Sequence, residues 1–328
     1  MAINFQSLKQ WLLYMISITK APTDQLAFKD KLYYSSACRV GFRHFIKHLD
    51  FGDQKILLPG YIGISVNEGS GVFDPIAEYQ IGYEFYKVKE DLSTDLVDFK
   101  ARILNGNVKA ALVIHYFGFL QSDIKTIAEL CRENNVLLIE DCAHTLTSTY
   151  EGTLLGQFGD VGLFSLHKIL PVPDGGILRI NNGNYFSIPP LSEEDRISQT
   201  TLEAFCASRL DQVSEVRRRN YLLLAAYLAD LNGIEVMYPE LPDRIVPQSF
   251  PILIKNLSRE KVYFAMIEKG VRVIALYYKL IEQISAQEHP ISYDISNRIL
   301  NLPIHQDLTQ DNLRLIAKSL HEVLHSLL

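Results

Sequence analysis

Between residues 55 and 180 the chain alternates short apolar runs with segments of helical periodicity. The apolar runs are KILLPGY, YEFYKV, AALVIHYF, VLLIEDCAH, VGLFSLHK and GGILRI. The segment SDIKTIAELCRENN, between the third and fourth runs, places Ile124, Ile127, Ala128 and Cys131 at helical spacing. Strands that alternate with helices are typical of a mostly parallel sheet with crossover helices. We therefore predict an α/β fold in which the two runs flanking this helix are parallel neighbours.

The pattern changes beyond about residue 190, where helical segments dominate. We expect helices over residues 192–205 and 210–233, a strand over 249–255, a helix capped by Ser258 and a last helix capped by Thr309. This order predicts a large domain over residues 1–190, followed over 191–328 by linking helices and a smaller α+β domain.

The apolar segment over residues 5–20 predicts an amphipathic helix packed on the body of the protein or on a partner subunit. It is too short to span a bilayer, and no small-residue cleavage site follows it.

Charge and cysteine content exclude several classes of partner. The net charge of -6 provides no general basic surface for nucleic acid. We expect the basic run 217–219 to form a solvated helix face. The four cysteines show no CxxC spacing, which argues against a metal site and favours a reduced, cytoplasmic chain. Because the apolar run at residues 5–20 is too short to span a bilayer, we expect no membrane partner. No GxGxxG motif follows an early strand, which argues against a Rossmann dehydrogenase.

Polar side chains follow two of the predicted strands. Asp141 and His144 come after VLLI, and Ser165 and Lys168 come after VGLF. Ligands of open α/β sheets bind beyond the carboxyl ends of the strands, so we expect both pairs at the same edge. Taken singly, each residue has a more ordinary explanation that is favoured over a functional one: Asp141 as a helix cap and Lys168 as an exposed lysine.

Together these groups form the set that a pyridoxal phosphate (PLP) site requires. The amine forms a Schiff base with the aldehyde, the carboxylate keeps the pyridine nitrogen protonated, and the hydroxyl helps to hold the phosphate. A second phosphate element is suggested by Ser35 and Ser36, which precede a helix that we expect to begin near Ala37. The free N–H groups at such a helix end could face an anion.

These motifs resemble those of the DegT/DnrJ/EryC1/StrS family of PLP-dependent sugar aminotransferases. The similarity runs from YYSSACRVGF, through the segment between ALVIHYFGF and GDVGLFSLHK, to ILNLPIHQDLT, and DGG resembles the glycine pair of the family. The resemblance implies an aspartate-aminotransferase-like, fold type I enzyme. In this sequence Lys168 stands three residues after Ser165, whereas five is the common spacing in the family.

By this resemblance, Lys168 would be the Schiff-base lysine and proton shuttle, and Asp141 would hold the pyridinium. His144 would lie against the cofactor ring or its 3-hydroxyl, and Ser165 would touch the phosphate. The first phosphate-binding turn would be formed by the backbone of Ser36, Ala37 and Cys38. Tyr61 is a candidate for the aromatic that stacks on the ring, with ordinary packing as the alternative.

The reaction implied is transfer of an amino group from an amino acid, L-glutamate or a similar donor, to a nucleotide-linked keto-sugar by a homodimer. Some relatives replace the lysine with histidine and act as dehydratases, so retention of Lys168 beside His167 favours transamination. A different PLP reaction on the same fold, by a sugar dehydratase or a lyase, is one alternative. A regulatory or interaction protein that has lost its chemistry is another.

Overall fold

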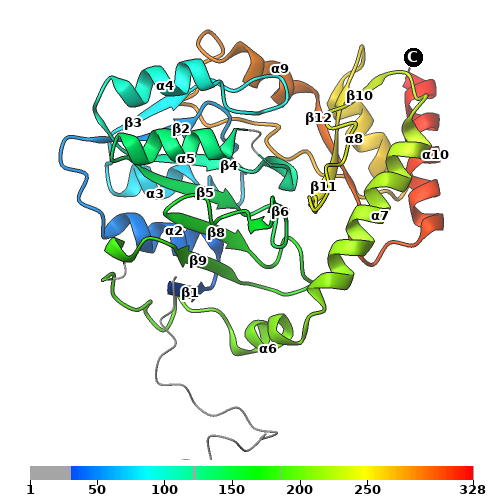
Figure 1. Cartoon of the computed structure of the whole chain (residues 1–328). Coiled ribbons are helices and arrows are strands. Elements are labelled where there is room, and N and C mark those ends of the chain that lie inside the picture. The colour runs from blue at the N-terminus through cyan, green and yellow to red at the C-terminus, as the bar shows by residue number, and fades with distance from the viewer. Residues whose placement is uncertain (1–30, 121–122, 186, 328) are drawn as a thin grey trace, which may run out of the picture.

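The computed structural model describes residues 31–120, 123–185 and 187–327. The helix predicted for residues 5–20 therefore lies outside the described residues. A seven-stranded sheet forms the centre of the molecule (Figure 1), and its strand order is β1-β9-β8-β5-β4-β2-β3. The strands are β1 (Lys31–Ser35), β2 (Lys55–Pro59), β3 (Tyr83–Tyr86), β4 (Val108–Ile114), β5 (Leu137–Cys142), β8 (Val161–Ser165) and β9 (Gly176–Ile180).

The six apolar runs of the sequence all form strands of this sheet. Strands β4 and β5 are parallel neighbours, as predicted. Strand β2 also pairs in parallel with β3 and β4, and β8 pairs in parallel with β5. Only β9 runs against the other strands of this sheet, since it pairs antiparallel with both β8 and β1. A parallel return needs a crossover helix, whereas β8 and β9 are joined by a short loop, which explains the reversal.

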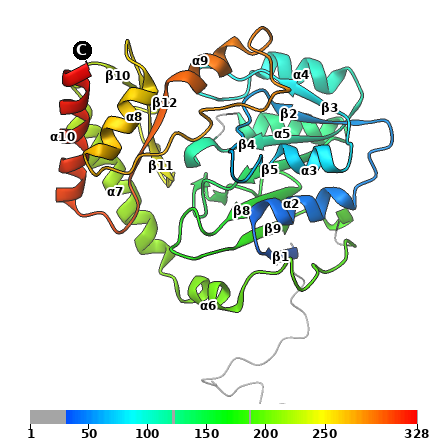
Figure 2. The same cartoon turned by 180° about the vertical axis from the view of Figure 1, so that it is seen from behind.

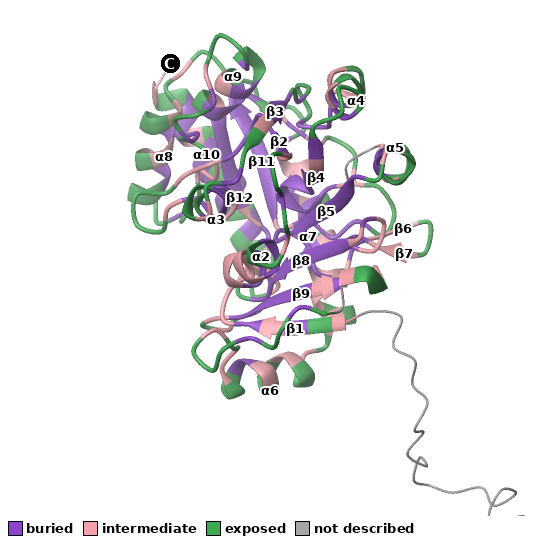
Figure 3. Cartoon of the chain, turned by 90° about the vertical axis from the view of Figure 1, so that its left-hand side faces the viewer, coloured by how far each residue is buried: buried purple, intermediate pink, exposed green. Residues whose placement is uncertain are grey.

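Helices cover both faces of the central sheet. Helices α4 (Leu96–Leu104) and α5 (Ile124–Glu133) lie on one face, and α2 (Cys38–Lys47) and α3 (Phe73–Glu78) lie on the other (Figures 1 and 2). Because the sheet is covered on both sides, β5 and β8 are buried along their whole length (Figure 3). This is why these strands read as continuous apolar runs rather than as alternating ones.

The second part of the chain forms a smaller antiparallel sheet with its own helices. Its strands are β10 (Ile234–Val236), β11 (Ser249–Ile254) and β12 (Ile299–Pro303), in the order β10-β11-β12. Helices α7 (Leu210–Leu228), α8 (Arg259–Glu268) and α10 (Gln310–Leu327) pack around it, and α6 (Gln199–Ala207) and α9 (Pro290–Arg298) connect the two parts. Ser258 caps α8, as predicted. The exact domain boundary near residue 190 stays a prediction.

A short hairpin completes the fold, with β6 (Thr149–Tyr150) paired to β7 (Thr153–Leu154). Within the described ranges, no helix combines the length and the apolar character that crossing a membrane would require.

Candidate functional site

A cavity of about 360 Å³ lies at the carboxyl ends of β5 and β8. Its walls are the first turn of α2, the loop over residues 62–72, the ends of the two strands, and residues 274–278 from the second part of the chain. A cavity of about 410 Å³ beside residues 135–138 is larger, yet its described lining holds no lysine. Chemistry rather than size therefore selects the first cavity.

Most of the residues singled out from the sequence meet in this cavity. Its lining includes Ala37, Cys38, Asp141, His144, Ser165 and Lys168. Ser36 does not line it: its N–H donates to the carbonyl of Asp195 at 2.8 Å, and its own carbonyl accepts from the N–H of Gly175 at 2.7 Å. The turn before α2 therefore faces the cavity through Ala37 and Cys38.

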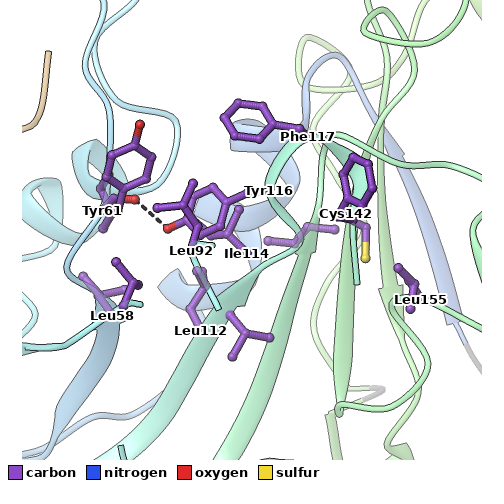
Figure 4. Packing of buried hydrophobic residues seen from close by; sticks show 14 of the residues in the cluster. Leu58, Tyr61, Leu92, Leu112, Ile114, Tyr116, Phe117, Cys142 and Leu155 are labelled. Carbon is purple, nitrogen blue, oxygen red and sulfur yellow. Dashed lines mark hydrogen bonds between the residues drawn. The ribbon is translucent and has the colours of Figure 1, made fainter. Parts of the chain in front are cut away.

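Tyr61 lies behind the cavity wall and is fully buried. Its ring centroid is 5.4 Å from that of Tyr116 and 5.2 Å from that of Tyr277, and the hydroxyl of Tyr116 donates to the Tyr61 carbonyl at 2.6 Å (Figure 4). The Tyr61 hydroxyl has no hydrogen-bond partner among the described residues. Tyr277 itself lines the cavity, so it stands between Tyr61 and the open space.

Lys168 sits in a tight turn directly after β8. The N–H groups of Ile169 and Leu170 both donate to the carbonyl of Leu166, at 3.0 and 2.8 Å, which closes the turn. The Leu166 N–H in turn donates to Gly175 at 2.9 Å. Burial lowers the pKa of the Lys168 amine, and the Asp141 carboxylate partly opposes this shift. A lowered pKa increases the fraction of neutral, nucleophilic amine.

Arg217 binds the lysine turn and is buried, which corrects the expectation of a solvated basic face for this residue, whereas Arg218 is half-buried and Arg219 is exposed. Its side chain is only 3% exposed. The guanidinium donates to the carbonyl of Ile169 at 3.1 Å, the carbonyl of Gln248 at 2.9 Å and Oε1 of Gln306 at 3.0 Å. The three acceptors lie around the guanidinium because α7 runs between the two parts of the chain. The planar guanidinium has five N–H donors and can bond all three acceptors at once.

Asp141 and the preceding Glu140 point to opposite faces of β5, as neighbouring residues of a strand do. Asp141 lines the cavity, and its Oδ1 accepts from the N–H of Ala143 at 2.8 Å. Burial raises the pKa of the Asp141 carboxyl, while the nearby Lys168 amine and the Ala143 N–H act to lower it. A cationic partner would therefore stabilise the ionised form of this buried carboxylate.

Glu140, which was not among the residues predicted from the sequence, holds the loop over residues 156–159 in place. Its carboxylate accepts from the N–H groups of Gly156, Phe158 and Gly159 at 2.6 to 2.9 Å, and from Nε2 of His115 at 2.9 Å. His115 joins Glu140 through this hydrogen bond, and Cys142 lies beside Glu140 because residues two apart on a strand face the same side. A charged residue inside the apolar run LLIEDC was the available signal, because a buried carboxylate requires such partners.

His144 is held as a neutral ring with a defined tautomer. The backbone N–H of Phe117 donates to its Nδ1 at 3.0 Å, so the ring proton lies on Nε2. Burial lowers the pKa of His144 well below its ordinary value, and the positive charge of Lys168 adds to this. The ring stacks on Phe117 at a centroid distance of 6.0 Å and meets Tyr277 edge-on at 5.8 Å.

The first turn of α2 offers backbone donors to the cavity. No side chain caps this helix and its first turn contains no acidic residue, so its leading N–H groups keep their positive potential. Gly176 of β9 allows the turn to approach closely, because a Cβ there would lie 2.3 Å from the Cys38 nitrogen. Ser165 borders the same space, with its Oγ 3.4 Å from Nδ1 of His167.

Arg39 and Glu68 also line the cavity, and the sequence reading missed both. They lie 29 positions apart in helix α2 and in the loop after β2, so no local pattern links them. Tyr277 and Tyr278, which come from the second part of the chain, both line the cavity as well.

Comparison with known proteins identifies similar sequences among enzymes of amino-sugar synthesis. The model of the DegT/DnrJ/EryC1/StrS aminotransferase family matches residues 86–188 and 204–321. GDP-perosamine synthase of Escherichia coli O157:H7 is 23% identical over 296 residues, which are 80% of this chain and 81% of the relative. A dTDP-4-dehydro-2,3,6-trideoxy-D-glucose 4-aminotransferase of Saccharopolyspora spinosa is 26% identical over 67% of each chain.

Solved structures agree on the fold. A DegT DnrJ EryC1 StrS aminotransferase from Brucella abortus matches with a TM-score of 0.73 and 19% identity, over 89% of this chain and 85% of that one. The PLP form of Spr1654 from Streptococcus pneumoniae matches with a TM-score of 0.76 and 13% identity, over 91% and 88%. The fold is thus the fold type I architecture expected from the sequence. With the matched family model spanning most of its length, this chain belongs to the DegT/DnrJ/EryC1/StrS aminotransferase family.

Proposed function

We propose that this aminotransferase uses PLP to transfer an amino group from L-glutamate, or a similar amino acid, to a keto-sugar carried on a nucleotide. The observation that carries the proposal is the meeting of Lys168 and Asp141 in one cavity with the uncapped start of α2. The names of the relatives, which specify GDP- and dTDP-linked sugars, support the class of acceptor.

The residues of the cavity fit this cofactor. Backbone N–H groups at Ala37 and Cys38, with the Ser165 hydroxyl, would hold its phosphate. Asp141 would hold the pyridine nitrogen, and a carboxylate about 4 Å from a pyridinium contributes roughly 4 kcal/mol at an effective dielectric of 20. Lys168 would be the covalent attachment point. When bound, the cofactor supplies an electron sink for the electrons of the donor Cα–H bond.

Lys168 would also carry the proton. Its lowered pKa makes the neutral amine available to take the proton from the donor Cα and return it elsewhere. The turn at residues 166–170 and the Arg217 contact to Ile169 hold the lysine backbone, so only the side chain needs to move.

His144 would present its Nε2–H to the bound ring. Because the Phe117 N–H occupies Nδ1, this histidine acts as a donor through Nε2 and adds no charge. We further propose that the chain works as a cytoplasmic homodimer; this extends from the family resemblance and from the absence of cysteine pairing in the sequence.

The proposal is tested by visible absorption and product analysis. Purified protein with added PLP should develop a visible band that glutamate removes, and glutamate nitrogen should appear in an amino-sugar product. Lys168→Ala should lose both, whereas Lys125→Ala, which changes an exposed lysine outside the cavity, should keep both. Undiminished turnover by Lys168→Ala would refute the proposal. Conversion of the sugar without consumption of donor nitrogen would indicate a dehydratase.

A further inference from the structure

The cavity contains an ion pair that the proposed chemistry does not use. Nη2 of Arg39, in the first turn of α2, lies 3.0 Å from Oε2 of Glu68, and its Nη1 donates to the Glu68 carbonyl. Both side chains border the cavity; the Arg39 side chain is 39% exposed and the Glu68 side chain is 72% exposed. Lys168 lines the same cavity.

Glu68 is presented by a well-defined turn. The N–H and carbonyl groups of Ser65 and Gly69 bond to each other in both directions at 3.0 Å, and the Ser65 hydroxyl accepts from the Glu68 N–H at 3.0 Å. Gly69 has a φ of 69°, and the next residue, Ser70, donates its N–H to Asp74 of α3 at 2.9 Å. The turn is thus anchored at its base, and Glu68 projects from it toward Arg39.

The charges around the cavity leave Arg39 as the cation available to an incoming anion. Among its described lining residues the acidic and basic groups are Arg39, Glu68, Asp141 and Lys168, together with two histidines. Burial favours the neutral form of both histidines, since it lowers the pKa of His144 and of His167. Lys168 and Asp141 have roles in the chemistry, which leaves the pair of Arg39 and Glu68.

We propose that Arg39 is the receptor for a carboxylate of the amino donor and that Glu68 is an internal carboxylate which occupies this receptor until the donor displaces it. The two residues would then set donor affinity in opposite directions. This inference rests on the proposed function for the identity of the donor.

The contact geometry favours a carboxylate over the cofactor phosphate as the ligand of Arg39. The backbone N–H groups of α2 already provide for a phosphate, whereas the Arg39 guanidinium binds Glu68 of the 65–69 turn. There it already engages a carboxylate oxygen at hydrogen-bond distance, so Glu68 marks where a donor carboxylate would lie.

The test measures binding of glutarate, a dicarboxylate without an amino group, by titration calorimetry in the absence of added PLP. Arg39→Gln should weaken binding roughly tenfold, the loss typical of a charge-assisted hydrogen bond. Glu68→Gln should tighten it by up to about fivefold, because removing a surface ion pair releases at most a small free energy. Arg209→Gln and Asp211→Asn, which disrupt an exposed ion pair of similar length (2.9 Å) outside the cavity, should leave binding unchanged.

A spectral titration with PLP, run on the same variants, separates this inference from the proposed function. If wild-type protein forms no visible band but the order of glutarate affinities holds, the cofactor proposal fails and the Arg39 receptor stands. Equal glutarate affinity in wild type and Arg39→Gln would overturn the receptor. It would also be overturned if Arg39→Gln weakened PLP binding and left glutarate binding intact, since Arg39 would then serve the phosphate.

Discussion

Replacing Gly176 by alanine should push the start of α2 away from the end of β8, and so separate the two parts of the proposed phosphate site. Gly176 pairs with Ser35 of β1 on one side and with Ser165 of β8 on the other, directly beneath the start of α2. An added Cβ would lie 2.3 Å from the Cys38 nitrogen and 2.4 Å from the Ala37 carbonyl carbon. Ordinary contact begins at 3.4 Å, so strand and helix must part by about 1 Å.

This shift should lower both the affinity for PLP and the free energy of unfolding. Overpacking of a tight contact typically costs roughly 1–3 kcal/mol of the unfolding free energy. A displacement of about 1 Å in a positioned site can cost on the order of 100-fold in function, so we expect PLP affinity to fall by at least tenfold.

The assay is a spectral titration with PLP beside a urea unfolding curve. Gly82→Ala is the control, because there the added Cβ meets at 3.1 Å only the flexible side chain of Lys55. If Gly176→Ala bound PLP as tightly as wild type at unchanged stability, the helix start would not be the phosphate site and the close approach would have no functional role.

Two further outcomes follow from the lysine turn. Arg217→Leu should cost roughly 3 kcal/mol of unfolding free energy in urea titrations, because the Gln248 carbonyl and Oε1 of Gln306 lose a buried charged donor, while the Ile169 carbonyl keeps its bond from Nε2 of Gln306. A loss below about 1 kcal/mol would contradict this. The rate at which PLP attaches should rise with pH, because only the neutral Lys168 amine attacks. Its midpoint should lie below about 10.4, the pKa of a free lysine, because burial lowers the pKa of Lys168; a midpoint at or above that value would refute the assignment.

Six of the seven strands of the central sheet could be predicted, because each is a local apolar run. The edge strand β1 was not predicted, because its residues are only partly buried and do not form such a run. Runs such as VLLIEDCAH and VGLFSLHK are apolar throughout, as strands buried on both faces must be. The helical segment between AALVIHYF and VLLIEDCAH implied that β4 and β5 pair in parallel. The meeting of Asp141 with Lys168 could be predicted for a related reason, since carboxyl ends of parallel strands share one edge. The sequence pattern did not predict that β9 runs antiparallel to its neighbours, because the direction of a strand depends on the connection before it rather than on its composition.

Other features depended on contacts between distant segments. Arg217 looked like part of a basic surface, yet α7 carries it into the interior, where the carbonyl next to Lys168 accepts its hydrogen bond. Ser36 looked like a phosphate ligand, yet its N–H is taken by Asp195.

The sequence alone determined the α/β architecture, the strand-end groups and the lysine that resembles a Schiff-base residue, because periodicity and motif spacing are properties of neighbouring positions. Tertiary structure alone decided which groups reach the cavity: it set Tyr277 in front of Tyr61 and paired Arg39 with Glu68. The reason is physical, since a side chain's burial and charge partners come from whichever segments pack against it, and those segments lie far away in the chain.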